Sequence, residues 1–186
     1  MEERYNNVAI ALHWLLALGI LCQIGLGWYL REVPRATPAR TVWVNLHKST
    51  GITLAALILI RVGWRLAHRP PALPRTMAAW ERIAARVNHA LLYACMIGMP
   101  LTGYVASNFS KFGIRYFGAI NLPPWGVDDK NIYAVFNTTH KTLSYLFVTL
   151  IALHIAAALK HLLVDRDGTI RRMWPAGRRV QQEALG

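Results

Sequence analysis

The sequence contains few acidic residues and few cysteines, and both shortages limit what it can be. Among 186 residues, 9 are Asp or Glu and 21 are Lys or Arg, and Cys22 and Cys95 are the two cysteines. Two thiols cannot build a four-cysteine iron–sulfur cluster, and the lack of a Cys-x-x-Cys-His motif excludes covalent c-type haem attachment. We interpret both cysteines as small packing residues.

Charge is also scarce over four long stretches of the chain. No Asp or Glu occurs in the apolar blocks 8–30, 42–66, 87–110 and 142–159. About 20 apolar residues suffice for a helix to cross the hydrocarbon core of a bilayer. The sequence therefore predicts an all-α fold, an integral membrane four-helix bundle that forms one domain over 1–186. We expect helices at about 8–30, 42–66, 87–108 and 133–164.

The first apolar block is expected to remain in the mature protein as the first helix. Glu2, Glu3 and Arg4 precede it where a signal peptide would carry a basic cluster, and no small-residue cleavage pattern follows.

The net charge of +12 is explained by membrane topology, and a nucleic-acid partner is not expected. With four crossings, eleven Arg residues fall on the side of the two termini and six Lys or Arg on the other. The positive-inside rule then predicts a multi-pass protein with both termini in the cytoplasm. The eleven are Arg4, Arg65, Arg69, Arg75, Arg82, Arg86, Arg166, Arg171, Arg172, Arg178 and Arg179, and the six are Arg31, Arg35, Arg40, Lys111, Arg115 and Lys130. Some of this charge can also hold anionic lipid headgroups.

Histidines lie within the apolar blocks at matched depths. His13 and His47 each lie roughly 9 Å in from the start of their helix at 1.5 Å per residue, and these two helices start at opposite faces of the membrane. His140 is near the outer end of the fourth helix, and His154 follows fourteen residues later, roughly 21 Å further along and on nearly the same face. His47 and His140 therefore share an outer level, and His13 and His154 share an inner one.

Two histidines at equal depth on facing helices can clamp a flat macrocycle from both axial sides. The neutral imidazole is an axial haem ligand, and such sites form between the helices of a bundle. Zinc prefers three or four donors around one point, which two distant pairs do not supply. The sequence thus predicts two b-type haems between the helices, one held by His47 and His140 and one by His13 and His154.

Four cations are placed to contact the haem propionates. Lys48 and Lys141 directly follow the outer-level histidines, and Arg61 and Arg65 lie one turn apart at the inner end of the second helix. Interfacial snorkelling of their long side chains is the alternative interpretation.

Five short motifs, in this order and spacing, resemble those of the bacterial cytochrome b561 family. They are Ala-Leu-His13-Trp-Leu, His47-Lys-Ser-Thr-Gly51, Thr-His140-Lys-Thr-Leu, His154-Ile-Ala-Ala-Ala-Leu-Lys-His161 and Asp167-Gly-Thr-Ile-Arg-Arg-Met-Trp-Pro175. The resemblance runs from Arg4 to Pro175 and implies a four-helix protein of the bacterial inner membrane with two haems. The ligand positions that it implies are again His13, His47, His140 and His154.

The resemblance also implies a function in electron transport. One type of member is a superoxide oxidase, which takes an electron from periplasmic superoxide and passes it to ubiquinone. On that interpretation the positive outer mouth steers superoxide, and no obligatory protein partner is expected. The steering residues would be Lys48, Lys141, Lys111, Arg115 and Lys130. His161 is the first candidate for a quinone contact and His89 the second, whereas His68 is interpreted as an ordinary loop residue.

Two rival functions remain open from the sequence. In the first, the chain is a haem-carrying membrane anchor subunit that passes electrons between a partner dehydrogenase or hydrogenase and quinone. In the second, it is a metal or proton transporter that uses the intramembrane histidines. Such pathways normally include carboxylates, and the apolar blocks contain none.

Overall fold

The computed structural model describes residues 4–72 and 77–175, and these contain four long helices. Arg75, Arg178 and Arg179, which were counted for the topology, lie outside the described residues. The helices are α1 (Asn7–Glu32), α2 (Pro38–Ala67), α3 (Ala79–Asn108) and α4 (Lys130–Lys160). A hairpin of β1 (Ile114–Tyr116) and β2 (Ile120–Leu122) joins α3 to α4, and α4 ends in a π-helical turn (His161–Asp165) followed by a 3-10 helix (Thr169–Met173).

The predicted fold class is confirmed. All four helices are long and apolar enough to cross a bilayer, with mean hydropathies from 1.4 to 2.0 over their most apolar 18 residues. Many large apolar side chains are exposed along them, as expected for surfaces that face lipid rather than water. The chain is therefore a multi-pass four-helix membrane protein.

Three of the four helices begin where a polar side chain caps them. Asn6, Thr37 and Asp129 each accept a hydrogen bond from a backbone N–H in the first turn of α1, α2 and α4. Pro38 stands at the first position of α2, where a missing N–H costs nothing. These caps explain why α2 and α4 begin three or four residues before the predicted starts.

The third helix begins at Ala79, eight residues earlier than the predicted start at 87. Its first two turns, around Trp80, contain the charged residues that precede the apolar block. Glu81 accepts the N–H of Ala78 at 3.3 Å and pairs with Lys160 of α4 at 2.8 Å, which stabilises this charged extension. Charge ended the apolar block at 87, but a helix continues beyond the hydrocarbon wherever its polar groups find partners.

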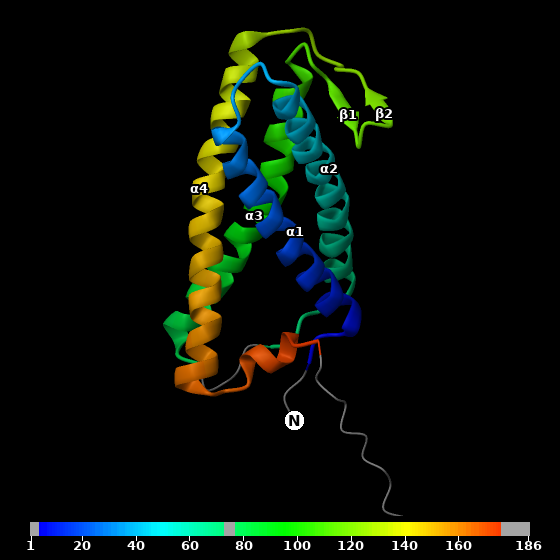
Figure 1. The fold of residues 1–186 in the computed structure, drawn as a ribbon. Helices are drawn as coiled ribbons and strands as arrows, with labels where there is room; N and C mark the ends of the chain where they lie inside the picture. The colour runs from blue at the N-terminus through cyan, green and yellow to red at the C-terminus, as the bar shows by residue number, and fades with distance from the viewer. Residues whose placement is uncertain (1–3, 73–76, 176–186) are drawn as a thin grey trace, which may run out of the picture.

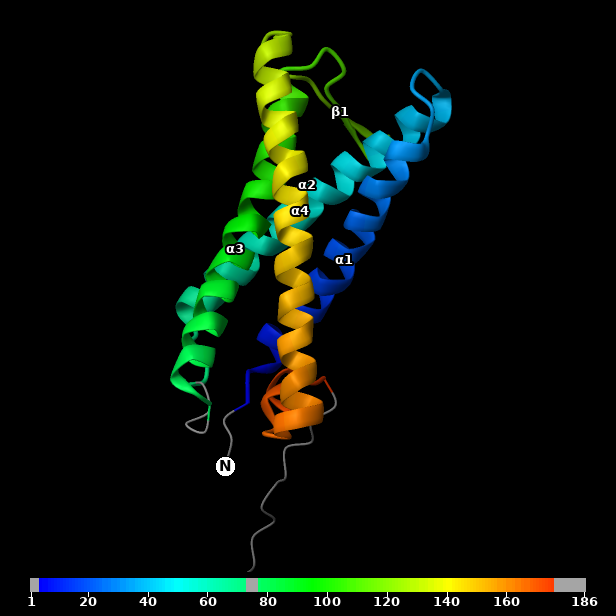
Figure 2. The same ribbon diagram turned by 90° about the vertical axis from the view of Figure 1, so that its left-hand side faces the viewer.

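The helices pack as two antiparallel pairs, α1 beside α2 and α3 beside α4 (Figures 1 and 2). The first and last described residues lie at one end of the bundle, which we call the terminal face, and the hairpin lies at the other, the hairpin face (Figure 1). Closely packed residues gather along the α3–α4 seam. This cluster is centred on Cys95, Phe147 and Leu150, and Ile20 of α1 packs against it. Cys95 is thus a packing residue, as predicted, while Cys22 is exposed.

The hairpin in the connection between α3 and α4 packs against the first half of α2. The Ser49 hydroxyl accepts the N–H of Phe117 at 2.9 Å and donates to the carbonyl of Asn45 at 2.7 Å. The hydroxyls of Thr53 and Tyr116 are hydrogen-bonded at 2.9 Å. Ser49 is fully buried and its hydroxyl both donates and accepts a hydrogen bond, so these bonds hold the hairpin to α2 without leaving a buried polar group unpaired.

Candidate functional site

The outer pair of histidines meets across the bundle near the hairpin face. His47 of α2 and His140 of α4 have ring centres 6.3 Å apart. Depth matching along the sequence placed them at one level, and the structure brings the two rings together with their planes 85° apart. We call this pair the hairpin level.

His140 is oriented by the backbone of α3. Its Nδ1 lies 2.9 Å from the Met99 carbonyl oxygen, an acceptor only, so Nδ1 carries the proton and Nε2 keeps its lone pair. The ring lies close to α3 because Gly103 has no side chain. A Cβ there would lie 3.1 Å from Cε1 of His140, closer than most real contacts. This is the tautomer that a metal-binding histidine needs.

His47 is surrounded by fixed polar groups. Its own carbonyl accepts a hydrogen bond from the Gln23 side-chain amide at 2.7 Å, and Gln23 also accepts from the Thr50 hydroxyl at 2.7 Å. Gly51 makes room for Gln23, because a Cβ at Gly51 would lie 3.3 Å from the amide nitrogen. The buried Nδ1 of His47 has no hydrogen-bond partner among the described residues. One ring nitrogen of His47 is thus a buried polar atom without a partner, which suits a site that is completed by a bound group.

The inner level contains three histidines, which we call the terminal level. His13 of α1 and His154 of α4 have ring centres 6.2 Å apart, as depth matching anticipated. His89 of α3 lies closer still to His154, with ring centres 5.3 Å apart. Depth matching did not include His89, because the predicted start of the third helix at 87 lies eight residues after the start of α3.

Arg61 of α2 reaches the terminal level. Its guanidinium donates to the Ala9 carbonyl at 3.1 Å and lies 3.4 Å from Nδ1 of His13. A guanidinium can only donate, so in this arrangement Nδ1 of His13 is the acceptor. A metal at Nε2 would place the proton on Nδ1 and remove that contact, leaving Arg61 available to an anion.

The spacing of both pairs fits an axially bound metal. Two imidazoles bonded to opposite sides of one metal at about 2 Å each have ring centres roughly 6 Å apart. The pairs at 6.3 and 6.2 Å match this value, whereas 5.3 Å between His89 and His154 is shorter. The residues therefore fit two bis-histidine haems, and their role as ligands remains a prediction.

The four predicted propionate contacts lie in different settings. The Lys48 ammonium donates to the Gly113 carbonyl at 2.9 Å and so ties α2 to the outer connection, while Lys141 is exposed. Arg61 is half-buried. Arg65 is exposed, and its guanidinium carbon lies 5.2 Å from the centre of the Tyr93 ring.

The predicted steering cations are gathered toward the hairpin face. Lys111, Arg115 and Lys130 are exposed in the connection or at the start of α4. Lys48 differs from them because it is half-buried and its ammonium is engaged. Exposed charges act on a diffusing anion over about one Debye length, about 8 Å at physiological salt.

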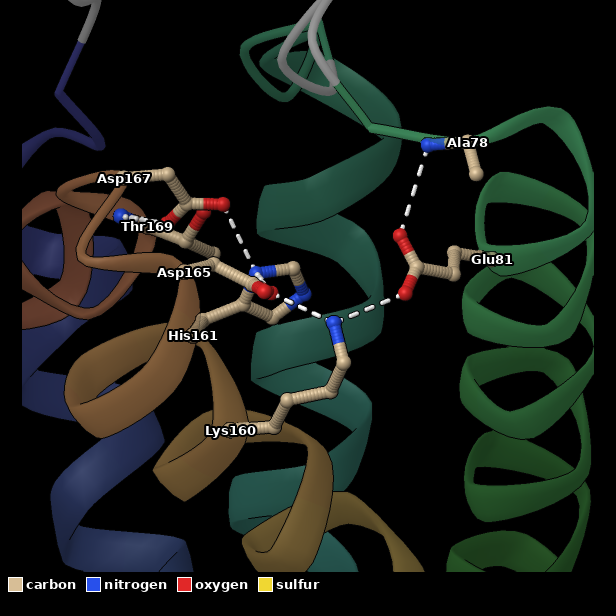
Figure 3. A network of polar contacts seen from close by, with 7 residues as sticks. All are labelled: Ala78, Glu81, Lys160, His161, Asp165, Asp167 and Thr169. Atoms are coloured by element: carbon tan, nitrogen blue, oxygen red, sulfur yellow. Dashed lines mark hydrogen bonds and ion pairs between the residues drawn. The ribbon is translucent and has the colours of Figure 1, made fainter.

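His161 lies in a network of charged side chains at the end of α4 (Figure 3). Its Nδ1 is 2.7 Å from Asp167 and 3.1 Å from Asp165, and Asp165 also receives Lys160 at 2.6 Å. Lys160 in turn contacts Glu81 of α3. The carboxylates hold the proton of His161 on Nδ1, so Nε2 is the nitrogen left for a ligand.

The carboxylate of Asp167 stays ionised in this network. Partial burial works against ionisation, but the Thr169 backbone N–H at 3.0 Å and His161 at 2.7 Å hydrogen-bond the anion, and the net pKa of Asp167 is lowered. The ligand atoms of His161, Asp165 and Asp167 lie within 4.8 Å of one another. The ammonium of Lys160 already balances Asp165, so a cation is not needed there.

His68 is exposed at the end of α2, where its ring stacks on Trp64 with centres 4.0 Å apart. It is the residue that follows the last turn of α2, and its backbone N–H donates to the Trp64 carbonyl.

The motif from Asp167 to Pro175 folds back beneath α1. The Trp14 indole donates to the Met173 carbonyl at 2.8 Å, Arg4 donates to the Trp174 carbonyl at 2.7 Å, and the Tyr5 N–H donates to the Arg172 carbonyl at 3.3 Å. This segment thus fastens the start of α1 to the end of α4 below the terminal level.

Comparison with known proteins gives a consistent result over nearly the whole chain. The sequence profile described as prokaryotic cytochrome b561 matches residues 4–176. Cytochrome b561 homolog 2 of Escherichia coli (strain K12) is 31% identical, covering 92% of this chain and 91% of that protein. Cytochrome b561 homolog 1 of the same organism is 26% identical, covering 93% and 98%. The probable superoxide oxidase CybB of Yersinia pestis is 26% identical, covering 96% and 99%.

Proposed function

The chain belongs to the prokaryotic cytochrome b561 family of membrane electron-transfer proteins, which bind b-type haem, and on this premise we propose that it is a two-haem superoxide:quinone oxidoreductase. Electrons would enter at the hairpin face and leave at the terminal face. The observation that carries the proposal is the pair of histidine couples with ring centres 6.3 and 6.2 Å apart at two depths of one bundle.

In this proposal two histidines from facing helices would hold each haem. His47 and His140 would hold the haem at the hairpin level, and His13 and His154 would hold the haem at the terminal level. When bound, each haem iron supplies the one-electron chemistry, cycling between the ferric and ferrous states. The protein fixes the ring orientations, as the Met99 carbonyl does for His140.

Charged side chains would compensate the propionates. Lys48 and Lys141 are adjacent to the hairpin-level ligands, and Arg61 and Arg65 lie near the terminal level. Arg61 supports this role most directly, because a proton on Nδ1 of His13 would displace its guanidinium toward a nearby anion.

The electron source would be superoxide. Each superoxide anion loses one electron and leaves as O2, so no bond to a protein side chain forms. The cations Lys111, Arg115 and Lys130, with Lys48 and Lys141, would raise the local concentration of the anion. The name of the Yersinia pestis relative supports this donor.

The acceptor would be ubiquinone at the terminal face. Reduction of one quinone to quinol takes two electrons, supplied by two superoxide anions, and two protons. His161 is the first candidate to contact the quinone, since Nε2 is its remaining nitrogen and its Nδ1 is held by carboxylates. His89 is the second, near His154 at 5.3 Å between ring centres.

A reduced-minus-oxidised absorption spectrum of the detergent-purified protein, with haem measured per chain, tests the architecture. We expect two b-type haems, of which one is lost in His47→Ala and the other in His154→Ala. A colourless protein purified after adequate haem supply would contradict the proposal.

A second measurement tests the donor and acceptor. Superoxide generated enzymatically should reduce the haems and then ubiquinone, with two superoxide anions consumed per quinol formed. If the haems are reduced only when a partner dehydrogenase or hydrogenase is added, the chain is an anchor subunit instead.

A further inference from the structure

The hairpin of β1 and β2 lies beside the part of α2 that crosses the membrane (Figure 1). Its contacts run from Asn45, whose side chain accepts the N–H of Arg115 at 3.3 Å, to Thr53, whose hydroxyl is bonded to that of Tyr116. Both residues of α2 belong to the apolar block 42–66, and they lie about 5 and 16 Å along the helix from residue 42. The hairpin therefore overlaps in depth with a membrane-crossing segment.

The two faces of the hairpin differ in polarity. On a strand, alternate side chains point to the same face of the sheet, and directly paired residues share a face. One face of this hairpin carries four apolar or aromatic side chains, and the other face carries two polar ones. They are Ile114, Tyr116, Ile120 and Leu122 on the first face, and Arg115 and Asn121 on the second.

The apolar face is directed toward the middle of the membrane. The Tyr116 side chain reaches Thr53, whereas the backbone N–H of the next residue, Phe117, bonds to Ser49, one turn nearer the start of α2. The exposed Arg115 side chain lies on the opposite face and so points away from the membrane. That direction suits a steering cation, which has to act through water.

Protein covers one half of the apolar face. β1 packs against α2, and β2 pairs with the outer edge of β1. Ile114 of β1 is buried, but Ile120 and Leu122 of β2 are exposed, and so is Phe117 at the turn. Exposure of such side chains to water costs free energy. β2 is therefore an overhang with an uncovered apolar surface.

The surface next to this overhang is one that faces lipid. Ile60 follows Thr53 by seven residues, which is two turns, so it lies on the same face of α2 as the hairpin contacts. Ile60 is exposed and belongs to the apolar block. The apolar side of the overhang is thus continuous with the lipid-facing surface of the helix.

The backbone of β2 limits how deep the overhang lies. Asn121 is paired with Arg115, whose N–H points away from β2 to Asn45, so the N–H and C=O of Asn121 point to the other edge of the sheet. Within the described part of the chain, no strand lies at that edge. Unpaired backbone groups are not tolerated in hydrocarbon, but water and headgroups satisfy them at the membrane interface.

We propose that the hairpin is a lipid-binding element that rests in the membrane interface at the hairpin face. Ile120, Leu122 and Phe117 contact the upper acyl chains of the phospholipids, and Arg115 and Asn121 face the water. Aromatic and apolar side chains beside polar ones are typical of segments at this level. The proposal does not depend on which donor or acceptor the haems serve.

The test measures how fast a water-soluble maleimide modifies cysteines introduced one at a time into the full, haem-loaded chain, at one chain per phosphatidylcholine nanodisc. The thiolate is the reacting form, and it requires contact with water. Cys22→Ala removes the exposed native thiol, and the buried Cys95 is kept. Ile120→Cys should react at least about tenfold more slowly than Asn121→Cys, although both side chains are exposed in the protein itself.

A control variant lies in the same connection outside the hairpin. Val127→Cys, beside the exposed Asp128, should react as fast as Asn121→Cys. Helical circular dichroism checks that each variant is folded. Equal rates for Ile120→Cys and Val127→Cys would overturn the proposal, because the apolar face would then be in water. Slow reaction of both hairpin variants would contradict it too, because its polar face must be wet.

A second measurement separates lipid from a protein partner. Phosphatidylcholine with a photoreactive diazirine on the upper part of an acyl chain should cross-link to the peptide that contains Ile120 and Leu122. If Ile120→Cys reacts fast in nanodiscs with one chain, and slowly only where two chains share a disc, the face is an interface between two copies and the proposal fails.

Discussion

The hairpin level and the terminal level each contain a pair of histidines whose ring centres lie about 6 Å apart, but the two pairs have different surroundings. At the hairpin level, His140 is bonded to a carbonyl and His47 lies beside the Gln23–Thr50 pair, so neutral groups hold the rings. At the terminal level, an arginine contacts His13 and a third histidine contacts His154.

The difference suggests two tasks for one ligand geometry. At the hairpin level, neutral groups keep His47 and His140 in fixed positions. In the proposed function, that end only has to attract an anion. The terminal level adjoins a cavity lined by four arginines, including Arg61 and Arg65, and the carboxylates around His161. In the proposed function, protons and a quinone are handled at that end, and titratable groups are useful there.

The largest expected effect tests which of the three terminal-level histidines are ligands. His13→Ala should lose the terminal-level haem, leaving about one haem per chain, whereas His89→Ala should keep two. The reason is distance, since 5.3 Å between His89 and His154 is short for two rings with a metal between them, and 6.2 Å is not. Haem quantification and the redox spectrum measure this, and the reverse pattern would reassign the ligand to His89.

The next largest effect is expected from a substitution that disturbs haem binding at the hairpin level alone. Gly103→Ala places a Cβ 3.1 Å from His140 and should weaken that haem about tenfold, a cost of 1–3 kcal/mol being typical of overpacking. The terminal-level haem should be unaffected. Gly25→Ala is the control, because its Cβ would meet nothing within 4 Å. Equal haem loss in the two variants, measured by titration of haem into the apoprotein, would refute the specific role of Gly103.

A smaller effect concerns pH at the terminal face. Because the pKa of Asp167 is lowered in the folded chain, its ionised form stabilises the segment above the ordinary pKa of about 4. That contribution is lost as the pH falls through the lowered value. Asp167→Asn should cost about 1 kcal/mol of local stability at pH 7 and remove this part of the pH dependence.

Hydrogen exchange of residues 168–175, corrected for intrinsic rates between pH 7 and pH 3, measures the effect of Asp167. Asp128→Asn is the control, since that side chain is exposed at the opposite end of the bundle. If Asp167→Asn retains the full pH dependence of the unmodified chain, another group controls the segment.

The smallest effect concerns the charge at the hairpin face. Lys111→Gln should slow superoxide-dependent haem reduction about twofold at low ionic strength, and the difference should vanish as salt is added. Arg86→Gln at the terminal face is the control and should leave the rate unchanged. A loss that persists at high salt would show that Lys111 acts by contact and not by steering.

Much of the fold could be predicted from the sequence, because it follows from the lengths of apolar blocks and from positions along single helices. Apolar blocks of membrane-crossing length predicted four helices, and positions along them predicted the couples His13–His154 and His47–His140. The errors occur where charge marks the edge of a block. The first turns of α3 were assigned to a connection, although Glu81 and Lys160 stabilise them as helix.

Other parts of the site had no signal in the sequence. The carbonyl of Met99 and the absence of a side chain at Gly103 position His140. Neither residue type by itself indicates such a role. Glycines on the third helix are the only hint, because a glycine lets another helix or ring come close. The π-helical turn that carries His161 toward Asp165 and Asp167 likewise has no periodic pattern to reveal it.

The sequence by itself determined how many helices cross the membrane and at which depth each histidine lies, because hydrophobic length and helical rise are properties of a single segment. Only the tertiary structure decided that the paired ring centres lie about 6 Å apart, that His89 joins the terminal level, and that four arginines line one cavity. Lateral distances depend on how the helices pack against each other. Contacts between residues far apart in the chain set that packing, and no local pattern encodes it.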